Sequence, residues 1–533
     1  MSVRSTIARN TFYNAAGRLW EFAAGIVLMR IIVEYIGVGE LGLWALVGPF
    51  IGYVALLDIG IGSGFSKYIA EHAARDEHRA LSEVVSTGFY YYLLFGAVIV
   101  AIGWPLLGLG IDAVAHWAGL AATSRNDLRF LFQWGLVLFA ASNCITAFTA
   151  IQTGLQRMGV TNALSFMASV VKIVGTVYFL ARGQGVRGLL YAEGLSTGTF
   201  ALASVVAAFC LRPSLRVSPR LVSWPAFRRL FGFGWRTQIA HLSNLVMFQT
   251  DKVVVGGYYS LLGVPAVARA QIGFYELGVN MANKMRQGPI VLTSALLPAA
   301  SDLHARNEHD RLKELYLRST KYLALVTVPA ALFTAAAAGI IMRAWMGEGF
   351  DRSAWILRII VVGYIANVVP GAGVSVVLGQ GRSGIIMKAG LVSMCSNLLL
   401  TIGLVLTIGF WGIPIATATS MIISWAWFAH VVRDDFDVGF GSLLRRTLLW
   451  PVLAAAPAVI PCVLFDRWGA VHPGFLTNLT LLAAAACAFA LVYALIMPRT
   501  PFMDSEDLRL LDSTLPLDRI PMARAWLRRA AHV

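Results

Sequence analysis

The chain has 533 residues, of which 58% are hydrophobic and only 13% are charged, and its mean hydropathy is +0.69. A soluble protein of this length does not carry so much apolar sequence, so the composition excludes a soluble enzyme and predicts an all-α integral membrane protein. The net charge of +15 is better explained by membrane topology and by attraction to anionic lipid head groups than by binding to nucleic acid.

Stretches of roughly twenty mostly apolar residues recur along the whole chain and predict about fourteen transmembrane helices. They are expected near residues 12–36, 41–65, 82–110, 127–153, 160–181, 186–210, 232–256, 269–298, 318–342, 353–380, 384–409, 411–433, 443–465 and 474–497. The first seventeen residues lack a short apolar core followed by a small-residue cleavage site, so the first span is expected to be retained.

The basic residues are distributed unevenly between the connections on the two sides. With the N-terminus inside, 27 of the 43 basic residues fall in connections on the inner side and nine on the outer side. Because cytoplasmic connections carry the excess of Lys and Arg, both termini are predicted to be cytoplasmic in a bacterial inner membrane.

An internal repeat relates the two halves of the chain. TGLQRMG (153–159) matches LGQGRSG (378–384) at a spacing of 225, and GVRGLLYAEGLS (185–196) matches GFWGIPIATATS (409–420) at a spacing of 224. An even number of crossings lies between matched segments, so the sequence predicts two parallel six-helix repeats plus two extra C-terminal helices. The expected parts are an N-terminal lobe 1–210, a basic cytoplasmic linker 211–231, a C-terminal lobe 232–433, two additional helices 434–497 and a basic cytoplasmic tail 498–533.

Two short motifs suggest enzymes, and both are interpreted as loops. GQGRSG (379–384) has the glycine spacing of a dinucleotide-binding loop, but it lies between two predicted membrane helices rather than after a strand. Asp435 and Asp437 have the D-x-D spacing of metal-dependent sugar transferases, yet no soluble α/β domain is expected to hold a sugar nucleotide. With no P-loop and five isolated cysteines, no enzyme activity, cofactor or metal site is expected.

Ionisable residues inside the predicted spans are the main functional signal, because charge at membrane depth is costly and usually lines a cavity or meets a partner. The basic residues interpreted as substrate-binding are Arg18, Arg30, Lys172, Arg236, Lys284 and Arg286. The acidic candidates for coupling to an ion are Glu21, Asp58, Glu193 and Asp251. Internal ion pairing remains an alternative for Arg18 with Glu21 and for Arg30 with Glu34, and Asp58 also suits a structural role.

The segments NAAGRLWEFAAGIVLMRIIVEYIGVGELGLWAL and LLDIGIGSGFSKYIAEH resemble the start of polysaccharide transporters of the O-antigen flippase type. That family belongs to the MOP superfamily, which also holds multidrug and toxin extruders and the lipid II flippase. The resemblance covers nearly the whole chain and is clearest at 10–72. It implies a V-shaped pair of six-helix lobes that works by alternating access.

The resemblance also implies the transport of a polyprenyl-diphosphate-linked oligosaccharide, such as an O-antigen or exopolysaccharide repeat unit, across the cytoplasmic membrane. Basic cavity residues would bind the diphosphate, H⁺ or Na⁺ is the expected coupling ion, and membrane lipids and other polysaccharide assembly proteins are possible partners. Two alternatives stay open. A multidrug or cation extruder of the same superfamily would need a cavity dominated by carboxylates, and a membrane glycan polymerase or ligase would need a large outer loop.

Overall fold

The computed structural model describes residues 3–56, 58, 62–117, 122–502 and 507. Every regular element in these ranges is helical, which confirms the predicted all-helical class. Packing divides the chain into two compact units, Met1–Phe274 and Tyr275–Val533. The boundary falls inside α9 (Pro265–Ile290).

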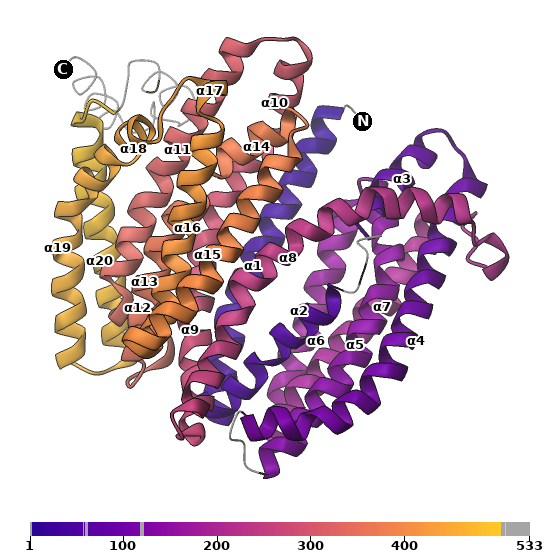
Figure 1. Cartoon of the computed structure of the whole chain (residues 1–533), viewed down its shortest axis with the longest axis horizontal. Helices are drawn as coiled ribbons and strands as arrows, with labels where there is room; N and C mark the ends of the chain where they lie inside the picture. The colour runs from indigo at the N-terminus through magenta and orange to yellow at the C-terminus, as the bar shows by residue number, and fades with distance from the viewer. Residues whose placement is uncertain (1–2, 57, 59–61, 118–121, 503–506, 508–533) are drawn as a thin grey trace. The chain divides into compact units, whose positions relative to one another are not determined.

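The first unit is built from eight α-helices that precede α9. They and one short 3-10 helix are α1 (Val3–Ala45), α2 (Val47–Ala55), α3 (Gly62–Ala74), α4 (His78–Trp117), α5 (Ala122–Gly154), α6 (Met158–Ala181), α7 (Gly185–Leu211), η1 (Pro219–Leu221) and α8 (Trp224–Leu261). Helices α4 to α7 lie side by side, with α4 packed on α5 and α7 packed on both α5 and α6 (Figure 1). Helix α8 packs on α2, α3 and α4 and therefore belongs to this unit. The sequence repeat instead predicted that the C-terminal lobe begins within α8, at residue 232.

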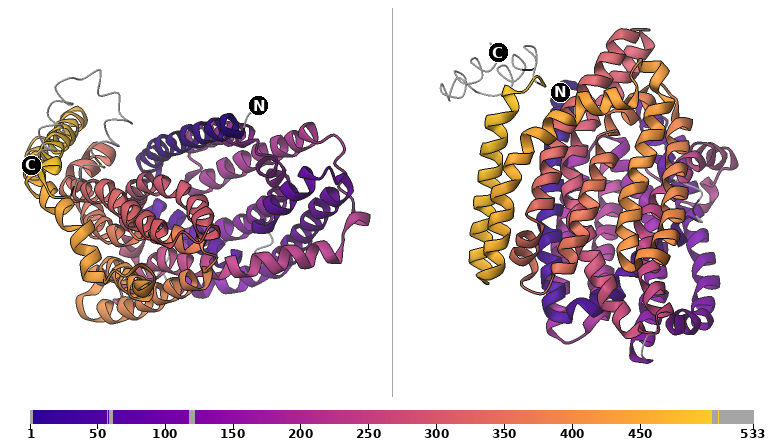
Figure 2. Two further views of the ribbon diagram at one scale, coloured as in Figure 1. Left: turned by 90° about the horizontal axis from the view of Figure 1, so that it is seen from above. Right: turned by 60° about the vertical axis from the view of Figure 1, so that its left-hand side comes forward.

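The second unit continues from α9 to the end of the chain. Its elements are η2 (Val291–Ala295), α10 (Leu296–Ala305), α11 (His309–Ala336), α12 (Ala338–Met346), α13 (Asp351–Val368), α14 (Gly371–Gly379), α15 (Ser383–Ile408), η3 (Gly409–Trp411), α16 (Gly412–Val431), α17 (Arg433–Phe436), α18 (Phe440–Thr447), α19 (Leu449–Val471), α20 (Phe475–Ile496) and η4 (Met497–Arg499). Helix α13 packs on α11 and α16, and α19 and α20 form an antiparallel pair at the edge of this unit (Figure 2).

Ten stretches among the described residues are long and apolar enough to cross a membrane. Three of them contain more than one α-helix: Leu19–Ala55 includes the bend of α1 at Gly37 together with α2, Asp351–Gly379 includes α13 and α14, and Ser383–Val431 includes α15 and α16. Helices α8 and α9 have the length of a span but are not among the ten. The protein is therefore a multi-pass helical membrane protein, and the number fourteen stays a prediction.

The backbone of the turn between α5 and α6 matches that of the turn between α14 and α15, where the sequence repeat was recognised. Gln156 and Gly381 both have positive φ angles, 55° and 76°. The residues that follow, Arg157 and Arg382, have nearly identical φ and ψ angles of −92° and 50°, and −89° and 49°. In both turns the amide of the arginine donates to the carbonyl five residues earlier, which satisfies a helix C-terminus by the Schellman pattern.

A second repeated turn escaped the sequence comparison. ARDEHRAL (74–81) joins α3 to α4, and ARNEHDRL (305–312) joins α10 to α11. Asp76 and Asn307 have φ angles of 53° and 58°, and each turn has the same Schellman hydrogen bonds. Aspartate and asparagine tolerate this left-handed conformation better than most residues, which accounts for the residue type at this position.

The basic linker is attached to α4 along most of its length. The Ser86 hydroxyl donates to the carbonyl of Arg216 and accepts from the amide of Ser218, both at 3.2 Å, and the Ser223 amide donates to Thr87 Oγ1 at 3.0 Å. The Arg216 and Arg220 side chains are exposed. The linker is thus a strap held on the surface of α4, with Arg216 and Arg220 on its exposed side.

A buried ion network holds α19 and α20 to the rest of the second unit. Asp466 of α19 accepts from Arg343 of α12 and from Arg358 of α13, with both N–O distances at 2.7 Å. Arg343 also donates to Asn478 of α20 at 3.4 Å. Gly339 leaves space for this carboxylate, since a Cβ there would lie 2.4 Å from Asp466 Oδ1. The two additional helices are therefore anchored by charge as well as by apolar packing.

Candidate functional site

A polar pocket of about 420 Å³ lies among α5, α6 and α7 in the first unit. Two charged side chains line it, Lys172 of α6 and Glu193 of α7. The remaining lining is Ser142, Ile145, Thr146, Thr149, Ser165, Ala168, Ser169, Ser196, Thr197 and Phe200. Seven of these residues carry a hydroxyl group, so the pocket is far more polar than the lipid-facing surface of a membrane helix is expected to be.

Lys172 and Glu193 form an ion pair, with Nζ and Oε2 separated by 2.6 Å. Their side chains are 37% and 35% exposed, so the pair is open to the pocket rather than enclosed. Both residues were predicted as site residues, Lys172 for substrate and Glu193 for ion coupling, but the sequence did not predict that they meet. Their spacing in the helical hairpin could have indicated this contact, because Lys172 lies eleven residues before Gly183 in the turn between α6 and α7 and Glu193 lies ten residues after it.

The hydroxyl groups of the pocket are held by helix carbonyls. Ser196 donates to the carbonyl of Ala168 at 2.8 Å, Ser142 to that of Phe139 at 2.8 Å and Thr149 to that of Thr146 at 3.1 Å. A hydroxyl that has donated its proton still has lone pairs that accept hydrogen bonds. The pocket therefore offers several acceptors and one ammonium group, a combination that suits sugar hydroxyls and phosphate oxygens.

Three other predicted acids of the first unit have different surroundings. Glu21 is exposed on α1, whereas Asp251 of α8 is 2% exposed. Asp58 Oδ2 accepts a hydrogen bond of 3.1 Å from the hydroxyl of Tyr92, a side chain that is 1% exposed. The contact with a buried tyrosine favours the structural role that the sequence left open for Asp58.

The remaining predicted bases of the first unit lie on α1 and α8. Arg30 is half-buried on α1. The side chains of Arg18 and Arg236 lie outside the described part of the structure, so their predicted contact with substrate stays a prediction.

Lys284 and Arg286 belong to the second unit, and both are half-buried on α9. Arg286 Nη1 donates to Asn367 Oδ1 of α13 at 3.1 Å, and its guanidinium lies 5.4 Å from the centre of the Tyr364 ring. The Tyr364 hydroxyl in turn donates to Asn283 Oδ1 at 2.8 Å. This polar cluster joins α9 to α13 and places the Arg286 guanidinium beside the neutral side chains of Asn367 and Tyr364.

The two motifs that suggest enzymes contact each other. Arg382 of GQGRSG pairs with Asp435 at 2.6 Å, and Lys313 of α11 pairs with Asp437 at 3.4 Å. GQGRSG follows helix α14 instead of a strand, so it is a turn between helices, as the sequence predicted. No cluster of three or more potential metal ligands occurs among the described residues, and each carboxylate of the D-x-D motif has a basic neighbour.

The helical architecture, the two repeated turns and the polar pocket describe a multi-pass helical membrane protein with an internal repeat. The comparisons with known proteins define its class as a transporter rather than an enzyme. The model of the family described as polysaccharide biosynthesis protein matches residues 35–355, and the chain belongs to this family of flippases within the MOP superfamily. A second model, described as lipid II flippase MurJ, matches residues 289–482.

Individual relatives are similar at low sequence identity. A protein of Shigella flexneri described as an O-antigen transporter is 21% identical over 71% of this chain and 86% of its own length. The solved structure of lipid II flippase MurJ in an inward closed conformation has a TM-score of 0.64 and 14% identity, and the match covers 91% of this chain and 98% of that one. An inward-facing multidrug resistance MATE family transporter has a TM-score of 0.59 and 16% identity, over 79% of this chain and 96% of that one. These structures establish the fold.

Proposed function

We propose that the protein moves a polyprenyl-diphosphate-linked oligosaccharide from the cytoplasmic to the outer leaflet of a bacterial inner membrane. The observation that carries the proposal is the Lys172–Glu193 pair in a hydroxyl-lined pocket at membrane depth. A hydrated glycan does not cross hydrocarbon without polar groups that replace its water. The hydroxyls of the pocket supply hydrogen bonds for sugars, and Lys172 supplies positive charge for a phosphate.

The ion pair offers a way to connect substrate binding to ion uptake. An arriving diphosphate carries more negative charge than one carboxylate, so it competes with Glu193 for the ammonium of Lys172. Once displaced, Glu193 becomes an unpaired carboxylate inside the membrane and then takes up H⁺ or Na⁺. Substrate binding and ion binding would thus favour each other at this pocket.

Arg286 and Lys284 provide the second basic group of the proposal. The Arg286 guanidinium donates to the neutral amide oxygen of Asn367, and phosphate oxygens are stronger partners because they carry negative charge and accept two parallel hydrogen bonds. We infer that Lys284 and Arg286 form an anion-binding group within the second unit, and that alternating access carries the substrate across the membrane. Arg286→Lys is expected to keep the charge but lose the two-pronged donor geometry, and so to restore transport only in part.

Transport by the purified full-length protein in vesicles tests the function. A labelled polyprenyl-diphosphate oligosaccharide is expected to become accessible on the opposite leaflet, while a cationic dye is not expected to accumulate. Movement of the dye without movement of the lipid-linked sugar would identify a multidrug extruder instead. Reporter fusions after Arg229 and after Val533 test the orientation, since both are expected to report the cytoplasmic side.

A further inference from the structure

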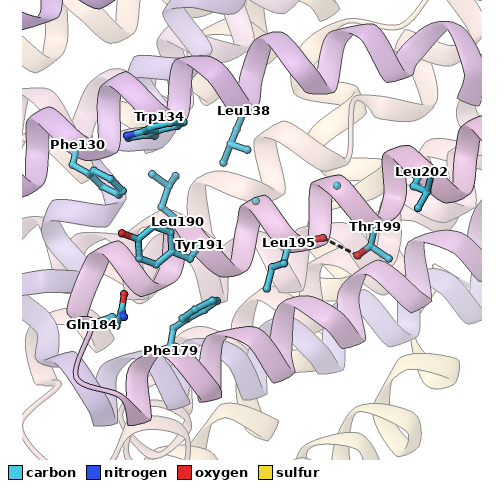
Figure 3. Close-up of a pocket in the computed structure, with 12 residues that line it drawn as sticks. Phe130, Trp134, Leu138, Phe179, Gln184, Leu190, Tyr191, Leu195, Thr199 and Leu202 are labelled. Carbon is cyan, nitrogen blue, oxygen red and sulfur yellow. Dashed lines mark hydrogen bonds between the residues drawn. The ribbon is translucent and has the colours of Figure 1, made fainter.

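An apolar groove of about 920 Å³ follows the side of α7 that faces away from the polar pocket. Its walls are aromatic and aliphatic side chains from α5, α6 and α7 (Figure 3). The pocket residues Glu193, Ser196 and Thr197 and the groove residues Leu195 and Leu202 project from different sides of the same helix. The groove is therefore a separate feature from the proposed transport site.

Two glycines keep the floor of the groove open. A Cβ at Gly198 would meet no atom within 4 Å, and one at Gly194 would meet only Leu138 Cδ2, at 3.7 Å. Beside them, Leu195 and Leu202 are 51% and 69% exposed. On a membrane-spanning helix these exposed apolar side chains contact lipid chains. From Leu190 to Leu202 the floor is about 18 Å long, calculated from the helical rise per residue.

One end of the groove is polar and lies near two arginines that do not line it. Gln184 lines this end, beside the turn between α6 and α7, and the exposed Arg182 lies two residues earlier with its guanidinium 4.8 Å from the Tyr178 ring centre. Arg187 lies 5.2 Å from the ring centre of Phe130, a wall residue, and pairs with Asp127 at 2.6 Å.

Along the rest of the groove, the hydroxyl of Thr199 donates to the carbonyl of Leu195 at 2.8 Å, so this polar group is satisfied within the helix (Figure 3). The groove thus combines an apolar channel with a polar end at Gln184, and the exposed Arg182 lies two residues from this end.

We propose that this groove is a specific site for an anionic membrane phospholipid. One acyl chain lies on the floor over Gly194 and Gly198, and the phosphate contacts Arg182 in the leaflet next to the turn between α6 and α7. An acyl chain gains little hydrophobic free energy when it moves from bilayer to groove, because both surroundings are apolar. Selectivity therefore comes from the charge-assisted contact with the head group.

Lipid retention by the full-length purified protein, measured by native mass spectrometry, tests the proposal. Phosphatidylglycerol and phosphatidylcholine with identical chains are the two probes. Wild type is expected to retain the anionic lipid about tenfold more than the zwitterionic one, as one charge-assisted contact predicts. Arg182→Gln is expected to remove this preference without affecting folding, because the side chain is exposed.

Gly198→Phe fills the floor of the groove and is expected to reduce retention of phosphatidylglycerol at least fivefold. Gly403→Phe in α15 is the matched control, since Gly403 is also exposed and a Cβ there meets no atom within 4 Å. Equal retention of both lipids by wild type, or unchanged retention in both Arg182→Gln and Gly198→Phe, would overturn the proposal. Retention of a polyprenyl-diphosphate probe in preference to phosphatidylglycerol would also overturn it, by assigning the groove to the transported lipid.

Discussion

The two ion clusters inside the helical units use the same chemistry with different surroundings. In the first unit, Lys172 and Glu193 form a one-to-one pair that is about one-third exposed to a polar pocket. In the second unit, Asp466 is shared by Arg343 and Arg358, and the Asp466 side chain is only 12% exposed. Separating a partly exposed ion pair costs little free energy when a competing anion arrives. Removing one member of a buried network destabilises the fold far more, because a charge is left buried without its partner. The comparison separates a candidate transport site from a structural anchor.

Removing the shared carboxylate of the buried network is expected to have the largest effect. Asp466→Ala leaves two arginines uncompensated and should lower the free energy of unfolding by about 3–5 kcal/mol. The measurement is thermal unfolding in detergent together with the yield of folded protein. Asp434→Ala is the control, because Asp434 is exposed, and its effect should stay within about 0.5 kcal/mol. Equal stability of the two variants would remove the distinction between the clusters.

Neutralising the acid of the open pair is expected to act on function more than on stability. Glu193→Gln removes the competitor for Lys172, so the affinity for a soluble diphosphate mimic should rise by about ten- to a hundredfold, equivalent to about 1.5–3 kcal/mol. Transport should nevertheless fall, because the carboxylate that takes up the ion is missing. Binding is measured by calorimetry and transport in vesicles. Weaker binding in this variant would show that Glu193 does not compete with the ligand.

Loosening the strap on α4 is expected to have an intermediate effect on stability that is confined to the linker. Ser86→Ala removes a donor and an acceptor of the linker backbone, which should weaken attachment by about 1–2 kcal/mol. Limited trypsin digestion after Arg216 and Arg220 should then become faster, while the global unfolding temperature changes little. Ser142→Ala, at a serine that bonds only to a carbonyl of its own helix turn, is the control. An unchanged cleavage rate would argue against the strap.

The smallest effect is expected at the exposed pairs of the D-x-D motif. Replacing Asp435 and Asp437 together by Asn removes two exposed pairs, each worth about 0–1 kcal/mol. Transport should stay near the wild-type value, and excess divalent metal should change nothing. A loss of transport that metal restores would revive the transferase interpretation.

The sequence predicted those features of the fold that depend on local residue patterns. Apolar run length predicted the helical membrane class, and spacing identified the turn at Arg157 and its counterpart at Arg382, which the backbone angles confirm. The family followed from the first two spans, and the matching family model confirms it. The division into two six-helix lobes, their V-shaped arrangement and the individual site residues stay predictions.

What the sequence missed depends on which residues meet in three dimensions. Helical periodicity does not give the register between neighbouring helices, so the Lys172–Glu193 pair went unrecognised although both residues were singled out. Arg343 and Arg358 were counted only as basic residues on the outer side, because nothing local indicates that Asp466, more than a hundred residues later, lies between them. The repeated ARDEH and ARNEH turns were overlooked because they lie in short polar connections between spans.

The most direct test of the central claim is the initial rate at which a labelled polyprenyl-diphosphate oligosaccharide crosses vesicle membranes, per folded molecule, in Lys172→Ala and in wild type. Lys388→Ala is the matched control, because Lys388 is exposed on α15. The proposed contact between ammonium and phosphate predicts that Lys172→Ala slows transport about ten- to a hundredfold, while Lys388→Ala is unchanged. Wild-type transport by a correctly folded Lys172→Ala protein would contradict the assignment of this pocket to the substrate.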